Sequence, residues 1–518
     1  MVKIVLTSDR SLMSEYRWLS LGDFLSCAPF EILPPSVFYF FSPSIPSFNG
    51  VASRAPYGLR KFEAALKIGY KPEEIVVAHP DYIQHFIDSD TEIVGINTMD
   101  PFGLGPASMM FTLGGRWTAY SKKLFIDLVK KIDNVRWLKG FKFKLVIGGP
   151  GAWQFEHYKD IIKELHIDNV IQGELDRVAC DVFQKILDDS SPSIIHIRDF
   201  PNVDDIPTIV NPSMHGMIEV MRGCGRNCEF CEPNLRKARH MPIEKILNEV
   251  RVNVKGGNDN VMVHSDDIFL YKLEDHKNFM PNSDAILELF TRIMAEPGVC
   301  QSNPTHGTIA PVAADPKMLK QLSIALKAGP MRLIGIQPGM ETGSPRLIAK
   351  YMPRKTLPFS PEEWGDVVFE ATKVFNENYW FPVYTLVMGL PEETSDDAWD
   401  TVRLLDFLER ELPRIVGGKA HFMAVPLSFV PTGVLGDKAF YYVRNALNEA
   451  NTCLLYRSWR HIIHEIDRSP KSVIKDPILR SIIKLLGGVA VRLSLHLLKK
   501  FAIKKGYDVE KAMRVKYA

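Results

Sequence analysis

Cysteine and net charge are both scarce in this sequence. Seven cysteines in 518 residues are too few for a disulfide framework in a chain of this size. The formal net charge of +2 lacks the basic excess of most nucleic-acid-binding domains, so we expect no nucleic-acid partner. No apolar run approaches the roughly 20 residues of a membrane-spanning helix. The first residues do not show the basic, then apolar, then small-residue segments of a secretory signal. We therefore expect a cytoplasmic protein.

The composition is that of a folded globular protein. Hydrophobic residues make up 46% of the chain and charged residues 24%, which excludes disorder and a coiled-coil rod. At roughly 150 residues per domain, the length predicts about three domains. Glycine loops that bind phosphate are absent, since neither a GxxxxGK[ST] run nor a GxGxxG run after a strand occurs.

Residues 1–190 predict a doubly wound α/β domain. Strands are expected at 3–7, 75–78, 93–97, 144–148 and 169–172, and helices at 59–68, 82–87, 120–132, 157–165 and 177–187. Apolar strands that alternate with helices favour a parallel sheet covered on both faces. The stretch 27–50, rich in Pro, Phe and Ser, is expected to be irregular. Ligands of such sheets lie beyond the carboxyl ends of the strands, here 97–108, 148–152 and 173–174.

A second βα series follows a linker at 191–212. Strands are predicted at 218–222, 261–264, 308–312, 332–337, 383–388 and 421–426, with helices at 243–254, 285–295, 316–328, 361–376 and 396–412. Six strands with crossover helices indicate a partial or full βα barrel over 213–433, whose site also lies at the carboxyl ends of the strands.

Residues 434–518 predict a basic helical domain. They hold 17 Lys and Arg against 7 Asp and Glu. The segment 477–505 combines Leu, Ile and Val with interspersed bases. Such a pattern is typical of a helix on a membrane surface, and equally of a helix docked on the protein with a solvated basic face. Peripheral membrane contact through 477–505 is therefore one of two interpretations.

Three of the cysteines are crowded into one loop. Cys224, Cys228 and Cys231 form a C-x3-C-x2-C run, and seven cysteines placed at random would produce it in only about one chain in several hundred. Thiolates bind iron-sulfur clusters and structural zinc, so three on one loop fill three corners of a metal centre. A zinc site would need a fourth ligand, for which His215 and His240 are the nearest candidates.

This run resembles the radical S-adenosylmethionine (SAM) superfamily, in which it binds a [4Fe-4S] cluster whose unligated iron chelates SAM. As in that family, the run follows the first predicted strand of a βα barrel. Two further segments are similar to runs of the family: Gly339–Ser344 to G-x-E-x-G-S, and Met388–Thr394 to G-L-P-x-E-T. The resemblance implies that Phe230 packs the adenine and that Glu341 lies near the SAM ribose. Asp266 and Asp267 stand where many members hold the SAM amino group with a Gly-Gly-Glu run.

The N-terminal sheet joined to this barrel resembles the cobalamin-dependent branch of the superfamily. There the corrin lies on the carboxyl edge of the sheet, where glycines permit close approach. The matching residues are Asn97, Gly148, Gly149, Pro150, Gly151, Gly173 and Glu174. The D-x-H-x-x-G signature is missing, so no histidine ligand to cobalt is expected. A sheet domain without corrin, serving as a binding module, remains the alternative.

The resemblance implies a C-methyltransferase that acts on an unactivated carbon. A 5′-deoxyadenosyl radical from SAM would abstract a hydrogen, and the carbon radical would take a methyl group from methylcobalamin. Relatives modify protein side chains, such as a glutamine of methyl-coenzyme M reductase, or join carbons in membrane lipids such as archaeal tetraethers. An electron donor such as ferredoxin or flavodoxin is implied as a partner. Tyr384 and His421 are candidate catalytic residues, although interior Tyr and His are commonly core residues. A non-enzymatic zinc protein is the remaining alternative.

Overall fold

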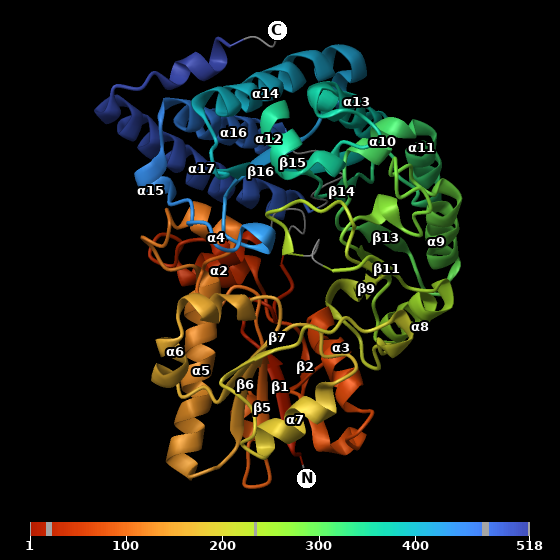
Figure 1. Cartoon of the computed structure of the whole chain (residues 1–518), viewed down its shortest axis with the longest axis vertical. Coiled ribbons are helices and arrows are strands. Elements are labelled where there is room, and N and C mark those ends of the chain that lie inside the picture. The colour runs from red at the N-terminus through yellow and green to blue at the C-terminus, as the bar shows by residue number, and fades with distance from the viewer. Residues whose placement is uncertain (1, 17–22, 233–235, 469–475, 516–518) are drawn as a thin grey trace. The chain divides into compact units, whose positions relative to one another are not determined.

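The computed structural model describes residues 2–16, 23–232, 236–468 and 476–515. Contacts divide the chain into two compact units (Figure 1). The first comprises Met1–Ile218, Met241–Val261 and Glu296–Cys300, and the second comprises Glu219–His240, Met262–Ala295 and Gln301–Ala518. The first unit contains one six-stranded sheet, and the second contains most of the strands of a βα barrel.

The first unit contains a six-stranded parallel sheet. Its strands are β1 (Ile4–Ser8), β4 (Ile75–Val77), β5 (Ile93–Asn97), β6 (Lys144–Gly148), β7 (Asn169–Gln172) and β8 (Ile194–His196), in the order β4-β1-β5-β6-β7-β8. All five neighbouring pairs are parallel. This is the flavodoxin-like order extended by one strand, and its topological switch point lies between β1 and β5. The doubly wound fold expected for this part of the chain is thereby observed.

Helices cover both faces of this sheet (Figure 1). The helices are α2 (Pro35–Phe41), α3 (Tyr57–Leu66), α4 (Pro106–Phe111), α5 (Tyr120–Lys139), α6 (Asp160–Glu164) and α7 (Ala179–Leu187). α3 and α7 pack on one face, where Leu59 and Phe183 join Leu6 in a buried cluster. α5 and α6 lie on the opposite face. α8 (Ile243–Lys255) also belongs to this unit.

Three segments of the first unit differ from the sequence predictions. β8 lies inside the predicted linker, because Ile194 and Ile195 extend the sheet by pairing with β7. α2 lies inside the stretch expected to be irregular, and its prolines stand at the helix start, where a missing N–H costs nothing. The helix predicted at 82–87 is only a 3-10 turn, Ile83–His85.

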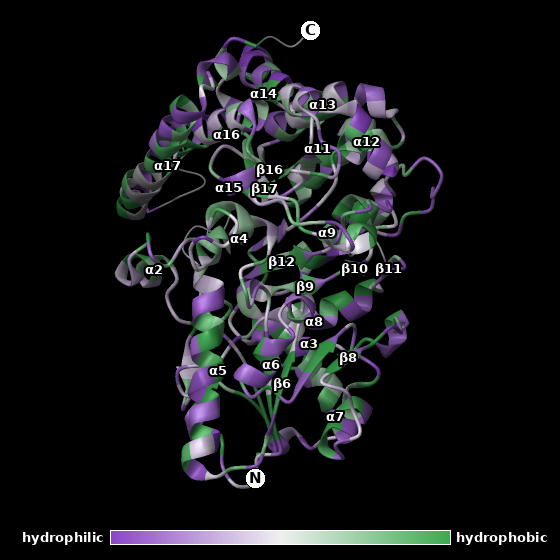
Figure 2. Cartoon of the chain, turned by 60° about the vertical axis from the view of Figure 1, so that its left-hand side comes forward, coloured by the Kyte–Doolittle hydropathy of each residue, from purple (hydrophilic) through white to green (hydrophobic). Residues whose placement is uncertain are grey.

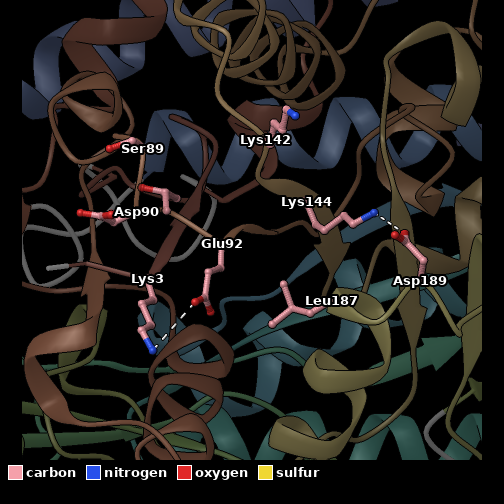
Figure 3. A pocket seen from close by; sticks show the side chains of 9 residues that line it. Lys3, Ser89, Asp90, Glu92, Lys142, Lys144, Leu187 and Asp189 are labelled. Atoms are coloured by element: carbon pink, nitrogen blue, oxygen red, sulfur yellow. Dashed lines mark hydrogen bonds and ion pairs between the residues drawn. The ribbon is translucent and has the colours of Figure 1, made fainter.

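A surface hollow lies at the amino ends of β1, β5 and β6 (Figure 3). Lys3 stands 3.9 Å from Glu92, and Lys144 pairs with Asp189 across it. Its charges neutralise one another, and ligands of parallel sheets bind at the opposite, carboxyl edge. This hollow is therefore not the candidate site.

The second unit is built on a partial βα barrel. Its strands are β9 (Ile218–Glu219), β12 (Asn260–His264), β13 (Gln301–Pro304), β14 (Ile334–Ile336), β15 (Gly339–Glu341), β16 (Trp380–Met388) and β17 (Met423–Ser428). One sheet has the order β13-β12-β9, while β16 pairs in parallel with β14, β15 and β17. β10 (Met221–Arg222) and β11 (Arg239–His240) form a small antiparallel ribbon beside the cysteine loop.

One predicted barrel strand is wrong. The apolar run at 308–312 leads into α10 (Ala310–Ala314), and the third strand is instead β13. β13 reads Gln-Ser-Asn-Pro and lacks an apolar pattern, so its extended conformation comes from pairing with β12. At this position the pairing with β12 determines the conformation, and the intrinsic preferences of the residues do not.

Helices surround the strands of this unit. They are α9 (Ser283–Ala295), α11 (Pro316–Ala325), α12 (Pro345–Tyr351), α13 (Trp364–Glu377), α14 (Ser395–Val416), α15 (Val443–Ala446), α16 (Glu449–Arg468) and α17 (Pro477–Lys505). Trp364, Phe375 and Trp380 are buried where α13 meets β16. Figure 2 shows hydrophobic residues concentrated in the strands and mixed with hydrophilic ones along the helices. None of the described helices combines the length and apolarity needed to cross a bilayer.

Candidate functional site

The cysteine loop follows the first barrel strand and is fastened at both ends. Gly223 N donates to a carboxylate oxygen of Asp266, which follows β12. Further along, Glu229 N donates to Tyr351 O (2.9 Å), and Thr432 Oγ1 donates to Phe230 O (2.8 Å). The segments after β12 and β17 and the end of α12 therefore hold the loop from Cys224 to Cys231.

Gly433 shows how tightly the loop is held. This glycine has φ of +64°, and a Cβ there would lie 2.6 Å from Glu229 O and 3.0 Å from Cys231 N. Because such approaches exclude any side chain, the loop after β17 needs glycine at this point.

Arg226, between the first two cysteines, anchors the loop from within. Its side chain is 1% exposed, and its Nη1 donates to Arg354 O (2.7 Å). Its Nε lies 3.4 Å from Asp267 Oδ2, and its guanidinium stands over the Phe279 ring. Its Nη2 has no hydrogen-bond partner in the described structure, which leaves one buried donor able to serve a bound anionic group.

A buried ion pair stands beside the thiols. Lys355 Nζ lies 2.7 Å from Glu341 Oε1, and both side chains are less than 10% exposed. Burial lowers the pKa of Lys355, but the charges of Glu341 and Cys228 outweigh burial and raise it above its ordinary value. Glu341 also has φ of +63°, a conformation that costs about 1–3 kcal/mol and is concentrated at functional sites. Lys355 was not identified from the sequence.

Of the three cysteines, Cys228 is buried and Cys224 and Cys231 are half-buried. Burial raises the pKa of Cys224, and nearby Asp267 adds to the effect. Burial also raises the pKa of Cys228, while the charge of Lys355 opposes it. The described residues contain no group of three His, Cys, Asp or Glu close enough to hold one metal ion. An iron-sulfur cluster does not need three ligands around one ion, because each thiolate binds a different iron. The three thiols of the loop are therefore suitable ligands for a cluster of iron and sulfide.

The segment Gly339–Ser344 is joined to α14, the helix that follows the segment Met388–Thr394. Gly343 N donates to Thr401 Oγ1 (2.8 Å), and Ser344 Oγ donates to Asp397 Oδ1 (2.5 Å). Thr394 caps α14 by accepting from Asp397 N. Burial raises the pKa of Glu393 to about 7, although its carboxylate accepts from Gly389 N (2.6 Å). These hydrogen bonds fix the segments that follow β15 and β16.

The residues predicted to place SAM are all found at the carboxyl ends of barrel strands. Phe230 is half-buried within the cysteine loop, and Glu341 ends β15. Asp267 is fully buried, and its oxygens accept from Thr308 N (3.0 Å) and Thr308 Oγ1 (2.6 Å). Asp266 likewise holds Gly223. Both aspartates therefore shape the loop, and direct contact with SAM stays a prediction.

Tyr384 and His421 have structural partners. Tyr384 is fully buried, and its hydroxyl lies 2.7 Å from Thr372 Oγ1 on α13. His421 precedes β17 at the amino end of the strand, and its Nδ1 lies 2.8 Å from Glu465 Oε2. Catalytic groups of βα barrels stand at the carboxyl ends, so these two residues belong to the core.

Two histidines at the barrel mouth escaped the sequence reasoning. His264 ends β12 and His306 follows β13, with ring centroids 6.2 Å apart. Because the position of β13 was predicted wrongly, nothing in the sequence placed His306 at a strand end.

In the first unit, the predicted corrin-binding residues lie at the carboxyl edge of the sheet. Asn97 Nδ2 donates to Ser8 Oγ (3.2 Å) across the switch point between β1 and β5. Thr98 follows, and its buried hydroxyl has no partner in the described structure. Asp9 stands at the end of β1, where burial raises its pKa to about 6. Gly149, Pro150 and Gly173 are exposed at this edge, and Glu174 is half-buried. Such an edge, with an unpaired hydroxyl, suits a large polar ligand.

The glycines of this edge have a reason that differs from the predicted one. A Cβ on Gly149 would lie 2.6 Å from Thr98 O, and one on Gly151 would lie 2.4 Å from Met99 O. A Cβ on Gly173 would lie 2.2 Å from Ile197 O. Packing between neighbouring loops therefore requires glycine at these three positions, and their contact with a corrin stays a prediction.

Residues 218–405 match the model of the radical SAM superfamily. Over 94 residues the chain is 32% identical to ribosomal protein uS12 methylthiotransferase RimO of Bacteroides fragilis, which covers 18% of this chain and 21% of that protein. Over 259 residues it is 22% identical to tRNA-2-methylthio-N(6)-dimethylallyladenosine synthase of the same organism, covering 48% and 55%. The chain thus spans between a fifth and about half the length of these curated relatives.

The fold is similar to that of the radical SAM methyltransferase TsrM from Kitasatospora setae. The structure with cobalamin and a [4Fe-4S] cluster gives a TM-score of 0.52 at 14% identity and covers 84% of this chain and 77% of TsrM. The structure with tryptophan substrate and a SAM analog gives 0.51 at 12% identity, covering 87% and 76%.

The chain therefore contains a radical SAM domain, and its overall fold is the one TsrM adopts. The expected radical SAM domain is confirmed over residues 218–405. The expected fold class is confirmed as well. The non-enzymatic zinc alternative is set aside by the same match.

Proposed function

We propose that this protein is a cobalamin-dependent radical SAM C-methyltransferase that acts on an unactivated carbon of a protein side chain. The observation that carries the proposal is the cysteine loop at the mouth of the radical SAM barrel, in a chain that also has a doubly wound sheet. TsrM, whose fold is similar, is a methyltransferase with cobalamin and a [4Fe-4S] cluster bound. A low-potential donor such as ferredoxin or flavodoxin would deliver the electrons.

The residues of the chain would hold and orient the cofactors. Cys224, Cys228 and Cys231 would bind the cluster, and Arg226 Nη2 would donate to an anionic group beside it. The carboxyl edge around Asn97 and Thr98 would hold cobalamin. Cluster, SAM and cobalamin together supply the electron, the hydrogen-abstracting radical and the methyl group.

A lipid substrate is the second candidate, favoured by the exposed aliphatic and basic residues of α17. In this alternative the enzyme forms carbon–carbon bonds in membrane lipids such as tetraethers. Both candidates begin with hydrogen abstraction by the radical, and they differ in the substrate and in the bond that is then formed.

The first test is SAM cleavage by anaerobically reconstituted protein under reducing conditions. Wild-type protein should form 5′-deoxyadenosine, Cys228→Ala should form none, and Cys300→Ala, which alters an exposed cysteine outside the loop, should match wild type. 5′-Deoxyadenosine from Cys228→Ala would contradict the cluster assignment.

The second test uses SAM with a deuterated methyl group, added with hydroxocobalamin to fractionated extract of the source organism. Mass spectrometry should find the label on a carbon of a peptide. Label or new carbon–carbon bonds in the lipid fraction alone would support the lipid candidate instead.

A further inference from the structure

α17 is docked on the protein by one side only. Its inner side packs against α16, where Leu498 and Ala502 are 6% and 1% exposed. The opposite side carries five large aliphatic residues that are 49–78% exposed: Ile478, Leu485, Leu493, Leu497 and Ile503. At 3.6 residues per turn these five fall within an arc of about 120°, away from Leu498 and Ala502. We call this arc the outer face of α17.

The outer face also carries positive charge that the protein leaves unneutralised. α17 contains seven Lys and Arg and no Asp or Glu. Arg492 pairs with Asp467 (2.9 Å), and Lys499 pairs with Glu510 (3.0 Å). Lys500 and Lys504 are exposed and make no ion pair within the described part of the chain, and both lie in the same arc as the aliphatic residues. Figure 2 shows hydrophobic and hydrophilic residues mixed along this helix.

We propose that the outer face of α17 docks on the surface of an anionic lipid bilayer, with the helix lying in the interface. Its aliphatic residues would enter the acyl boundary while Lys500 and Lys504 contact headgroup phosphates. Insertion across the bilayer is not proposed, since α17 is too polar to span it. The two interpretations of the sequence thus apply to opposite sides of one helix. This inference does not depend on the proposed methyl transfer.

The composition of the outer face favours a bilayer over a protein partner. Protein interfaces are enriched in Tyr, Trp, Phe and Met and depleted in Lys. Apart from His496, the exposed residues described in this arc are instead Leu, Ile and Lys, and aliphatic residues with bases are typical of helices that lie on membranes.

Vesicle flotation with the full chain tests the proposal. Phosphatidylcholine vesicles with and without about a third of phosphatidylglycerol are compared at low salt. Wild-type protein should float with the anionic vesicles and stay behind with phosphatidylcholine alone. L493E/L497E and K500E/K504E should each weaken partitioning by about tenfold or more, because each removes one of the two attractions.

Control variants carry the same kinds of substitution at exposed positions of α11. Ile324→Glu introduces an acid at a 71% exposed aliphatic residue, and K317E/K320E reverses two exposed lysines. Both should partition like wild type. Circular dichroism and iron content should match wild type for every variant.

The result is decisive in either direction. Flotation that both outer-face variants lose and both controls keep supports the proposal. No wild-type flotation, flotation unaffected by the outer-face variants, or binding of this face to an acidic protein without vesicle binding would overturn it.

Discussion

Lys355 and Glu341 form a buried ion pair in the barrel, close to Cys228 of the cysteine loop. Lys355→Met would leave the Glu341 carboxylate buried without its partner, which costs about 3–5 kcal/mol of unfolding free energy. Lys355→Met/Glu341→Gln should recover much of that loss, since no buried charge remains. Denaturant unfolding of the single and double variants measures the difference. Equal destabilisation of both would show that the pair itself is unimportant.

Glu393 makes stability depend on pH. Its pKa is raised by burial to about 7, from an ordinary value of 4.5, so the folded state binds the proton more tightly than the unfolded state. The stability from this proton is fully present below pH 4.5 and is lost as pH rises to about 7, by about 3 kcal/mol in total.

Glu393→Gln should remove this dependence. Between pH 5 and 7.5, wild type should lose about 2–3 kcal/mol relative to the variant, as measured by urea unfolding. Glu362→Gln, at an exposed position, is the control and should keep the wild-type profile. A difference between wild type and Glu393→Gln that stays constant with pH would contradict this account.

The sequence revealed the residues whose signal is local. Cys224, Cys228 and Cys231 were identified by their spacing, and Glu341 by the short segment around it. Arg226 and Lys355 were missed because their meaning depends on partners brought together only by folding, such as Arg354 O for Arg226. Asp9 was missed because a single acid after a strand has no spacing to recognise.

At the scale of elements, the contact of the loop after β15 with α14 depends on Gly343. A Cβ there would lie 2.7 Å from Asp400 O and 2.7 Å from Thr401 Cα. Gly343→Ala should therefore lower the unfolding free energy by about 1–3 kcal/mol through overpacking. Gly418→Ala, where a Cβ meets nothing within 4 Å, should be neutral. Thermal unfolding compares them, and equal midpoints would argue against a tight contact.

Elements with a strong apolar pattern were predicted well. β12 and β16 were expected at nearly the observed positions, because their buried residues recur along the strand. β13 was not, since its Gln-Ser-Asn-Pro sequence forms a strand only beside β12. β8 was hidden in a segment rich in prolines and acids. Weak strands of this kind are determined by their neighbours, which the sequence does not show.

At the scale of the whole molecule, the two compact units do not follow the order of the chain, because each contains segments that are separate in sequence. α8 was predicted as the first helix of the barrel domain, yet it clusters with the first unit. Glu249 on α8 pairs with Lys61 on α3 in a buried ion pair of 2.5 Å. A pairing across almost 190 residues cannot be read from local pattern, which explains why the predicted domains followed sequence order.

The measurement that tests the central claim most directly is iron, cobalt and zinc per chain. The protein is reconstituted anaerobically with iron, sulfide and hydroxocobalamin and then desalted. Three thiolates on one loop predict about four irons, and the doubly wound sheet predicts one cobalt. Iron without cobalt would contradict the cobalamin assignment, and one zinc without iron would contradict the radical SAM account as a whole.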